Sequence, residues 1–468
     1  MKRLVLIGLL LGLLLCALTS TFKFSFTPNI SVVKANPADI WVPYNYPTIQ
    51  AAINAANSGD VIHVVGGPYA RIVVNKTVSL VGEGEAIIDG EGIVQQGIVN
   101  ITVNGVSIRN FIIRNAPEGY GIFLDGRTFC YLENNRIENV HYGILVDGTE
   151  KGSSNIYITG NNITNVYYGV SITNSSNNNI LTNNIHAWWV GVQISLLGDS
   201  YYGINNLISN NNITGISTTE GIRIISPNNT ICNNWVSNCD WGIHIEFSNN
   251  TIHHNNFINN TNQAYVHMSA TNNKWNLDWP MGGNFWSSHS LTDIFNGEYQ
   301  NQPGSDGICD TPYIVEGDDV DKYPLMGPCN RFEVLFGPYP PTKHEILVIS
   351  NSSISTFQMN TTQRTISFNV SGDAGIGFCR VDIPNVIVGG LWPSGYTVLV
   401  NDQAPLYMRN WTSGTTTYIY FQYLHSTKEV IIVPEFQTAL ILLLMIFTTL
   451  IVIAKKCIKN TNTHFSLF

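Results

Sequence analysis

Charged residues are scarce in this sequence of 468 residues, because Asp, Glu, Lys and Arg together make up 12% of it. That share is about half of the usual one. The 23 basic residues are spread thinly and the formal net charge is −9, so no basic stripe can neutralise a row of phosphates. The sequence also lacks a nucleophile elbow, a zinc-ligand motif and a nucleotide-binding loop. Nucleic acid is therefore not an expected partner.

Asparagine supplies much of the polarity that charges do not. It makes up about 12% of the chain, and a further 40 residues are Gly. The hydrophobic fraction is 44%, with 11% aromatic residues, which excludes an intrinsically disordered chain because such chains cannot bury enough apolar surface. The composition predicts a packed structure whose surface is amide and hydroxyl rather than ionic.

The N-terminal end has the pattern of a secretory signal. Lys2 and Arg3 precede the apolar run 4–18, which matches the charged and apolar regions of a signal peptide. Small residues offer a cleavage site either near Ala17 or later, after Ala35, and both sites stay open. We therefore assign residues 1–35 to the signal peptide region and expect the bulk of the chain to be exported.

The C-terminal end has the pattern of a membrane anchor. Residues 436–454 carry no charge, and at about 1.5 Å per residue such a segment just spans a bilayer. Lys455, Lys456 and Lys459 follow it, which predicts a cytoplasmic tail over 455–468. We expect a protein that is secreted and anchored to the cell membrane, with an extracellular ectodomain.

Cysteines and glycosylation sequons fit an extracellular location. The spacings Cys232 to Cys239 and Cys309 to Cys329 are compatible with local disulfides in an oxidising compartment, and buried free thiols are the alternative. Two more ectodomain cysteines stand at Cys130 and Cys379. Asn-x-Ser/Thr sequons, the acceptors of N-linked glycans, include Asn75, Asn162, Asn212, Asn259, Asn360 and Asn410.

A repeat organises the first two thirds of the chain. Gly followed by alternating apolar residues recurs at Gly97, Gly121, Gly143, Gly169, Gly191, Gly221 and Gly242. Asn-Asn pairs recur in counterpoint at Asn134, Asn161, Asn183, Asn211, Asn233 and Asn255. Strands with a period of two, stacked at one coil for each repeat, form parallel sheets around an apolar core. Asn suits the corners because it tolerates the left-handed backbone conformation and its amides can stack.

The linked motifs resemble those of NosD-like proteins with a pectin-lyase-type right-handed parallel β-helix. The resemblance rests on the opening "WVPYNYPTIQAAINAANSGDVIHVV", on the coils, and on the stretch from "GNFWSS" to "DGICDTPYIVEGDDVDKYPLM". It implies a β-helix over 40–328, with a capping helix at 47–57 and cap loops at the C-terminal end. The predicted fold class is all-β: this solenoid, then a β-sandwich, then the transmembrane helix.

The segment 332–433 predicts a separate β-sandwich module, because alternating apolar runs are parted by Gly, Pro and Asn turns. The sequence "VPEF" at 433–436 resembles a PEF-type C-terminal sorting signal of archaeal and some bacterial surface proteins. That resemblance implies a sortase-like processing enzyme as a partner. A retained membrane anchor is the equally weighted alternative.

Two outward lanes follow the glycines and define candidate sites. Four residues after the Gly, Asp125 and Asp147 would lie about 5 Å apart on adjacent coils. Two carboxylates at that distance can share calcium or act as acid and base, so they are candidate catalytic residues. Solvated surface residues are the alternative. The same lanes carry Gln193, Arg223, His244 and Glu246 as candidate ligand-binding residues.

Aromatic residues directly before the glycines are candidates for binding sugar rings. They are Tyr120, Tyr142, Tyr168 and Trp241. Aromatic faces pack against apolar sugar faces while neighbouring amides bind hydroxyls. Core packing at the corner is the alternative. Trp188 and Trp189, near a loop expected at 197–205, are further candidates.

The sequence also offers candidate ligands for two metals, calcium and copper. The acidic run Asp306, Asp310, Asp318, Asp319 and Asp321 is interleaved with glycines and suits calcium, although it lacks the spacing of an EF-hand loop. The NosD resemblance implies copper, for which the concentrations of ligands are the pairs at 253–254 and 267–268. Adjacent residues of a regular strand point to opposite faces, so His253 and His254 are not expected to ligate together.

The sequence thus favours a cell-surface β-helix protein that binds extracellular or envelope carbohydrate. A polysaccharide lyase or glycoside hydrolase acting through the acidic residues of the β-helix face is the enzyme alternative. A non-catalytic structural surface protein, or a NosD-like metal-binding protein, is the third.

Overall fold

The computed structural model describes residues 37–149, 151–198 and 203–435. The predicted signal peptide region, transmembrane helix and cytoplasmic tail lie outside these residues. Within the described part of the chain, no helix is long and apolar enough to cross a membrane.

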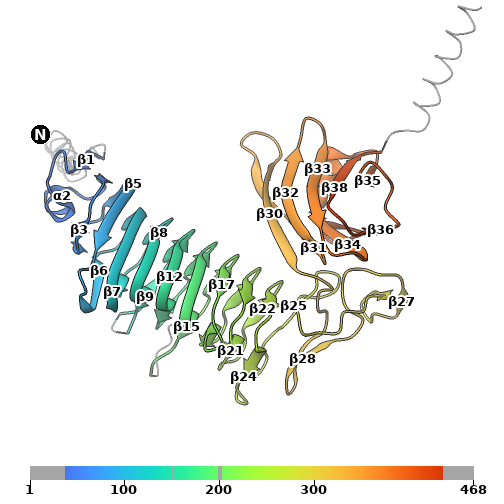
Figure 1. Ribbon diagram of the computed structural model, residues 1–468, viewed down its shortest axis with the longest axis horizontal. Helices are drawn as coiled ribbons and strands as arrows, with labels where there is room; N and C mark the ends of the chain where they lie inside the picture. The colour runs from blue at the N-terminus through green and yellow to red at the C-terminus, as the bar shows by residue number, and fades with distance from the viewer. Residues whose placement is uncertain (1–36, 150, 199–202, 436–468) are drawn as a thin grey trace, which may run out of the picture. The chain divides into compact units, whose positions relative to one another are not determined.

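Parallel strands stack coil upon coil in one 23-stranded sheet (Figure 1). One column of pairings contains β1 (Asp39–Val42), β2 (Val61–Val65), β5 (Ser79–Asp89), β7 (Ser107–Asp125), β8 (Tyr131–Glu133), β11 (Tyr157–Thr159), β14 (Asn179–Leu181), β16 (Leu207–Ser209), β19 (Thr230–Cys232) and β22 (Thr251–His253). A second contains β9 (Arg136–Asp147), β12 (Asn162–Thr173), β15 (Asn184–Ser195), β17 (Asn212–Thr214), β20 (Trp235–Ser237), β23 (Asn256–Ile258) and β25 (Phe285–Trp286).

A third column forms the face that carries the candidate site residues. It runs from β6 (Val94–Ile101) through the second halves of β7, β9, β12 and β15 to β18 (Glu220–Ile225), β21 (Trp241–Ile245) and β24 (Asn262–Val266). Short strands complete the coils: β3 (Tyr69–Ala70), β4 (Ile72–Val74), β10 (Ser153–Ser154) and β13 (Ser175–Ser176). The parallel β-helix predicted from the repeat is therefore present.

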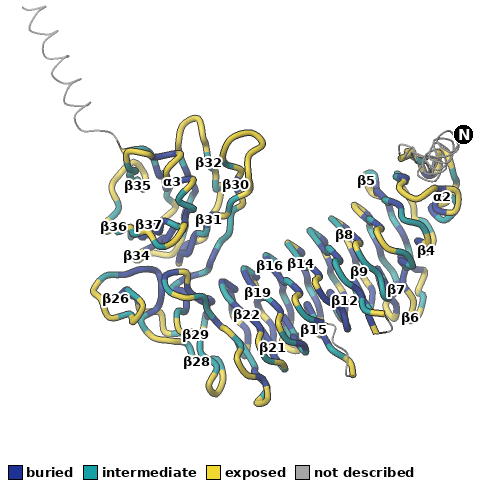
Figure 2. The backbone as a smooth tube through the Cα atoms, turned by 180° about the vertical axis from the view of Figure 1, so that it is seen from behind, coloured by how far each residue is buried: buried dark blue, intermediate teal, exposed yellow. Residues whose placement is uncertain are grey.

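The recurring glycines are required by the close approach of the coils. A Cβ on Gly143 would lie 2.5 Å from the carbonyl oxygen of Gly169, and a Cβ on Gly169 would lie 2.4 Å from that of Gly191. Real Cβ atoms do not approach so closely, so any side chain here would push adjacent coils apart. In the coils from Gly121 to Gly242 the residues one and three after the Gly are buried in the core, such as Ile144 with Val146 and Ile243 with Ile245, so buried and less buried positions alternate along these strands (Figure 2).

Asparagine forms a buried ladder along one corner. The side-chain Oδ1 of Asn183 accepts a hydrogen bond from the backbone N–H of Asn161 at 2.9 Å, and Asn211 accepts in the same way from Asn183. The complete ladder is Asn135, Asn161, Asn183, Asn211, Asn234, Asn255 and Asn284. A second ladder contains Asn178, Asn206, Asn229, Asn250 and Asn273.

The predicted Asn corners contain two different positions. Asn134 and Asn233 have φ values of 54° and 58°, so they are the left-handed residues that turn the chain, and the ladder residue follows each of them. In the coil of Asn183, Thr182 takes the left-handed position. Asn thus serves both the turn and the ladder.

The N-terminal cap is the helix α2 (Ile49–Ala55). The hydroxyl of Thr48 caps it by accepting from the N–H of Ala51 at 3.1 Å. Ile49, Ala52 and Ile53 are buried against the first coils. The predicted amphipathic cap is confirmed, with its helical part shorter than the predicted segment.

Cap loops with two small hairpins follow the last coil. The first pairs β26 (Phe295–Asn296) with β27 (Gln302–Pro303), and the second pairs β28 (Tyr313–Glu316) with β29 (Asp319–Asp321).

Two antiparallel sheets then share a buried apolar core. The five-stranded sheet has the order β30 (Cys329–Phe336), β31 (Thr342–Ser350), β34 (Ile376–Pro384), β37 (Thr416–Leu424) and β36 (Tyr407–Ser413). The four-stranded sheet has the order β32 (Ser353–Asn360), β33 (Thr365–Ser371), β38 (Lys428–Pro434) and β35 (Tyr396–Val400), and the short helix α3 (Asn385–Leu391) links β34 to β35.

The six cysteines of the described residues are free and buried. The expected local disulfides Cys232–Cys239 and Cys309–Cys329 are therefore not formed. Burial also raises the thiol pKa of Cys239 to about 12, so these side chains act as small apolar residues of the cores.

Candidate functional site

The two aspartates predicted to be catalytic lie side by side. Asp125 ends β7 and is paired with Asp147 at the end of β9, which confirms the predicted register. Asp147 Oδ1 accepts a hydrogen bond from the backbone N–H of Thr149 at 2.9 Å, so this carboxylate helps to form the turn after its strand. On the next coil, Thr173 occupies the position paired with Asp147. A catalytic role for the pair stays a prediction.

The tyrosines directly before the repeat glycines form an inner aromatic column. Tyr142 and Tyr168 stack with their ring centroids 4.4 Å apart and an interplanar angle of 2°, and Tyr120 meets Tyr142 edge-on at 5.6 Å. All three rings are half-buried, and burial, followed by the neighbouring Tyr168, raises the pKa of Tyr142 to about 12. Because the stacked faces cover each other, these rings offer mainly their edges to a ligand.

A second, more exposed column runs beside the first, one residue earlier in each coil. His141 and Tyr167 stack at 5.0 Å, and Tyr167 stacks on Trp189 at 5.9 Å. Tyr167 and Trp189 are each 39% exposed, and the adjacent Trp188 is 46% exposed. We call the two columns together with Trp188 the aromatic patch. Reading the sequence two residues before each Gly would have found the outer column.

An ionic cluster follows the aromatic patch on the next coils of the same face. Glu220 Oε1 contacts His244 Nδ1 at 3.1 Å, and Glu246 Oε1 contacts Arg223 Nη2 at 2.9 Å. His244 Nε2 also lies 3.4 Å from that Glu246 oxygen. The structure thus brings together three of the predicted ligand-binding residues. The sequence prediction missed Glu220, because it occupies the position before the Gly where only aromatic residues were sought.

The remaining predicted residues of this face lie in the same columns. Gln193 is paired with Arg223 on the neighbouring coil. Trp241 is paired with Glu220 and meets the ring of Tyr265 edge-on at 5.3 Å. The aromatic and charged groups therefore form one continuous face across successive coils.

Among the described residues, the acidic run that was expected to bind calcium does not form a group of three side chains that could hold a metal ion. Asp306 accepts from the indole of Trp279 at 2.8 Å, whereas Asp319 accepts from the indole of Trp275 at 2.7 Å. Asp310 accepts the backbone N–H groups of residues 294 and 295. Asp321 is buried and accepts hydrogen bonds from Asn284, Trp286 and Tyr323, while Asp318 is exposed. Each buried carboxylate is held by its own partners, so calcium binding stays a prediction without a shared set of ligands.

The β-helix segment of the chain matches a known protein family. Residues 76–291 match the model of a family described as periplasmic copper-binding protein (NosD). The matched segment contains the glycine column and the whole of the buried Asn ladder that begins at Asn135. The chain carries a NosD-like parallel β-helix.

This NosD-like segment also has a curated relative. A cell surface glycoprotein of Methanothermus fervidus is 34% identical over 210 residues, which is 42% of this chain. The chain spans about a third of the length of that relative. Both matches support an extracellular or surface location for the NosD-like protein.

Solved structures with coiled strands resemble the chain more distantly. The mannuronan C-5 epimerase A-module of Azotobacter vinelandii covers 47% of this chain and 76% of its own at 15% identity, with a TM-score of 0.36. An alginate lyase of a Paenibacillus species covers 50% and 93% at 18% identity, with a TM-score of 0.36. A tailspike capsular polysaccharide depolymerase of an Acinetobacter baumannii bacteriophage covers 84% and 83% at 10% identity, with a TM-score of 0.37. Likeness at this level leaves activity open.

The described residues do not fit the copper ion that the family description names. Copper sites use clusters of His, Met or Cys, but in the described ranges no three His, Cys, Asp or Glu side chains group around a possible ion. His253 Nδ1 lies 3.0 Å from His254 Nδ1, and His254 Nε2 donates to the carbonyl of Met281. Both imidazoles are thus engaged in hydrogen bonds.

The geometry of this histidine pair corrects one sequence expectation. His254 has a φ of 54° and therefore turns at the corner instead of continuing the strand, so the two rings approach each other. Burial lowers the pKa of His253 to about 4 and that of His254 to about 3. Both rings are neutral at physiological pH.

The sequons named above are accessible. Their asparagines are all exposed in the structure. A glycan attached at these positions would point into solvent, which is compatible with an extracellular glycoprotein.

Proposed function

We propose that this protein is a cell-surface β-helix protein that binds extracellular or envelope carbohydrate on its aromatic patch. The observation that carries the proposal is the outer column, in which Tyr167 and Trp189 are each 39% exposed beside an equally accessible Trp188. Soluble proteins rarely expose several large rings together unless they form a binding surface. Aromatic rings suit sugars because they pack against apolar sugar faces.

Polar groups complete the surface that a sugar needs. Gln193 lies on the coil of Trp189 and the ionic cluster on the next coils, and they supply amide, carboxylate and guanidinium groups for hydroxyls. From the coil of Tyr120 to the coil of Tyr265 there are six steps, so at about 4.8 Å per coil the face extends about 29 Å. That length suits an oligosaccharide rather than a single sugar.

A glycan array probed with the full chain tests the proposal. We expect retention of at least one glycan class, and loss of that retention in the double variant Tyr167→Ala/Trp189→Ala. Trp235→Ala is the matched control, because Trp235 is 36% exposed but lies on β20, in another column. Unaltered retention in the double variant, or an empty array with wild-type protein, would refute the proposal.

A second candidate is a polysaccharide lyase or glycoside hydrolase. It is favoured by two carboxylates, Glu220 and Glu246, that contact the same imidazole of His244, because such groups can transfer protons. Asp125 and Asp147 are the earlier candidates for the same chemistry. Release of new reducing or unsaturated ends by wild-type protein, abolished in Glu246→Gln or in Asp147→Asn, would support this function. No release by wild-type protein would exclude it for the polysaccharides assayed.

We further propose that residues 436–454 hold the protein in the membrane, either as a retained helix or until a sortase-like enzyme processes the "VPEF" segment. The support is the uncharged run followed by lysines. Mass spectrometry of the mature C-terminus from membranes distinguishes the two forms, and recovery of the intact chain in the soluble fraction would refute both.

A further inference from the structure

A groove of about 1260 Å³ lies at the C-terminal end of the β-helix, between β24 and the cap loops. We call it the C-terminal groove. Its lining includes Tyr265, Asn273, Tyr299, Gln300, Glu316 and Asp318. It continues the proposed glycan-binding face, because Tyr265 lines it and meets Trp241 and His244 edge-on at 5.3 and 4.7 Å.

Two buried polar atoms in this groove have no hydrogen-bond partner among the described residues. One is Asn273 Nδ2 and the other is Gln300 Oε1. Asn273 ends the second Asn ladder, so its Oδ1 accepts from Asn250 but no further coil accepts from its own amide. A buried donor or acceptor without a partner costs about 1–3 kcal/mol. The residues that line the groove therefore include an unused donor and an unused acceptor, each of which a hydroxyl group can satisfy.

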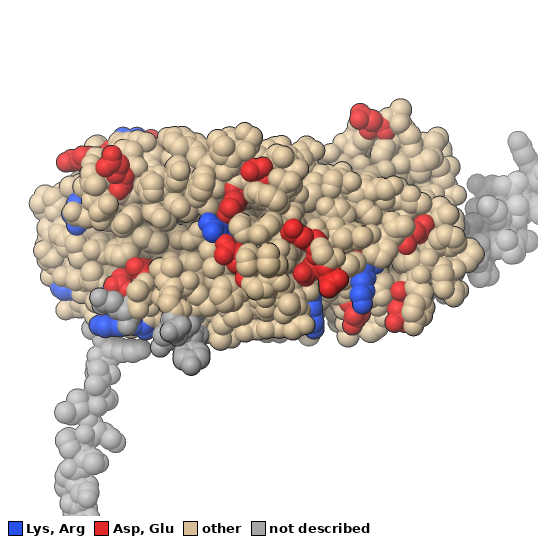
Figure 3. Space-filling model, turned by 90° about the horizontal axis from the view of Figure 1, so that it is seen from below, with Lys and Arg blue, Asp and Glu red and all other residues tan. Residues whose placement is uncertain are grey.

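Tyrosine rings and carboxylates define the rest of the groove. Tyr299 is 78% exposed and offers an aromatic surface for a sugar ring. The acidic residues lining the groove are Glu298, Asp310, Glu316, Asp318 and Asp319, against a single lysine, Lys322. Acidic side chains also gather near the middle of the face drawn in Figure 3.

These carboxylates repel negative charge. Burial, together with the charges of Asp318 and Glu316, raises the pKa of Asp319. A sugar carboxylate or sulfate would enter a site of the same sign, whereas a protonated amine would be attracted.

We infer that the C-terminal groove is the end subsite of the glycan-binding face and that it admits neutral or amino sugars and rejects uronates. This inference rests on the proposed function and adds the class of sugar. It follows from the unused donor and acceptor, the exposed tyrosine and the excess of carboxylates in one groove.

Titration of the full chain with three oligosaccharides tests the inference. The probes are chitosan oligomers with amines, chitin oligomers without charge, and oligogalacturonate with carboxylates. We expect both uncharged and cationic probes to bind at least about tenfold more tightly than oligogalacturonate, since one or two surface charge contacts contribute that much. Added salt should weaken chitosan binding and leave chitin binding unchanged.

A charge-neutralised variant separates this inference from the proposed function. In Glu316→Gln/Asp318→Asn, oligogalacturonate should bind more tightly and chitosan more weakly, with chitin unchanged. Gln at 316 retains the acceptor for the N–H of Val266, and Asp318 is exposed, so folding is preserved. Equal affinity of wild-type protein for oligogalacturonate and chitin, or an unchanged preference in the variant, would overturn the groove inference alone. An empty glycan array would remove the proposed function and this inference together.

Discussion

The carboxylate of Asp321 ends the buried ladder at Asn284. Asp321 Oδ2 accepts the backbone N–H of Asn284 at 2.7 Å, in the place where each earlier coil supplies an Asn Oδ1. The same oxygen accepts from the indole of Trp286 at 2.9 Å. Asp321 is thus a structural cap for the solenoid, although the sequence suggested a calcium ligand.

Replacing Asp321 should destabilise the C-terminal end of the β-helix. Asp321→Ala leaves the donors of Asn284, Trp286 and Tyr323 without their acceptor. A buried donor without a partner costs about 1–3 kcal/mol, so we expect the free energy of unfolding to fall by at least about that much. Urea denaturation followed by tryptophan fluorescence measures the change.

Asp318→Ala is the control for this prediction. Asp318 is exposed, and exposed positions away from special features usually change stability by less than about 0.5 kcal/mol. Equal denaturation midpoints for the two variants would show that Asp321 does not cap the ladder.

The glycine column predicts a steric effect of a single methyl group. Gly169→Ala would place its Cβ 2.4 Å from the carbonyl oxygen of Gly191 and equally close to Ile185. Overpacking usually costs about 1–3 kcal/mol, and we expect the upper part of that range because the contacted atom is backbone. Gly389→Ala in α3 is the control, since its Cβ would meet nothing within 4 Å. If both variants melt at the same temperature as wild type, the glycines are not required by coil spacing.

The coils could be predicted from the repeat. The contact of Asp321 with Asn284 at the C-terminal end of the β-helix could not, because it forms only in the folded chain. Gly169 and Asn183 recur at a short, regular spacing, so the sequence indicated their neighbours on adjacent coils. Asp321 reaches Asn284 across 37 residues of irregular loop, and no periodicity indicates that contact. Glu220 was missed for a different reason, because it breaks the aromatic pattern of its column while keeping the register. Tyr167 could have been predicted from the sequence, because it stands two residues before Gly169 in the same repeat.

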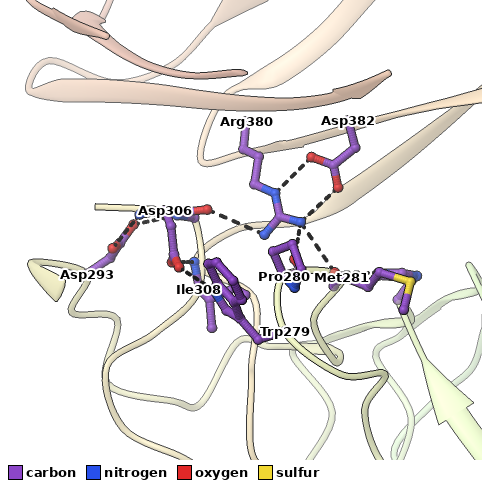
Figure 4. A network of polar contacts seen from close by, with 10 residues as sticks. Trp279, Pro280, Met281, Asp293, Asp306, Ile308, Arg380 and Asp382 are labelled. Carbon is purple, nitrogen blue, oxygen red and sulfur yellow. Dashed lines mark hydrogen bonds and ion pairs between the residues drawn. The ribbon is translucent and has the colours of Figure 1, made fainter. Parts of the chain in front are cut away.

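The buried ion pair between Arg380 and Asp382 should be costly to break. Arg380 donates to Asp382 through Nε at 2.8 Å and Nη2 at 2.9 Å, and it also donates to the carbonyls of Pro280, Met281 and Asp306 in the cap loops (Figure 4). Arg380→Met would leave a buried carboxylate and several carbonyls unpaired. Losing one partner of a buried pair costs about 3–5 kcal/mol, which urea denaturation can measure.

Two further variants test the predicted cost of breaking the buried pair of Arg380 and Asp382. Arg380→Met/Asp382→Leu removes both charges and should recover part of the lost stability. Lys343→Ala breaks a surface pair in which Lys343 is 76% exposed, so we expect a loss of about 1 kcal/mol or less. A loss in Arg380→Met no larger than in Lys343→Ala would contradict the prediction.

The contribution of Asp293 to stability should fall as pH rises from about 4 to about 8, because its carboxyl group is buried in the cap. Burial, followed by the charge of Asp306, raises the pKa of Asp293 to about 8, whereas an unfolded aspartate titrates near 3.9. Between these values the folded chain holds a proton on Asp293 that the unfolded chain has released, so the contribution of this group to the free energy of unfolding decreases with pH and levels off above about 8. Burial also raises the pKa of Asp321 to about 7, which acts in the same direction. Urea denaturation of wild-type protein and of Asp293→Asn across this pH range measures this contribution, because the slope of the wild type should be more negative by the share of one proton, about 1.4 kcal/mol per pH unit. Equal slopes for the two proteins would show that Asp293 is ionised in the folded cap at neutral pH.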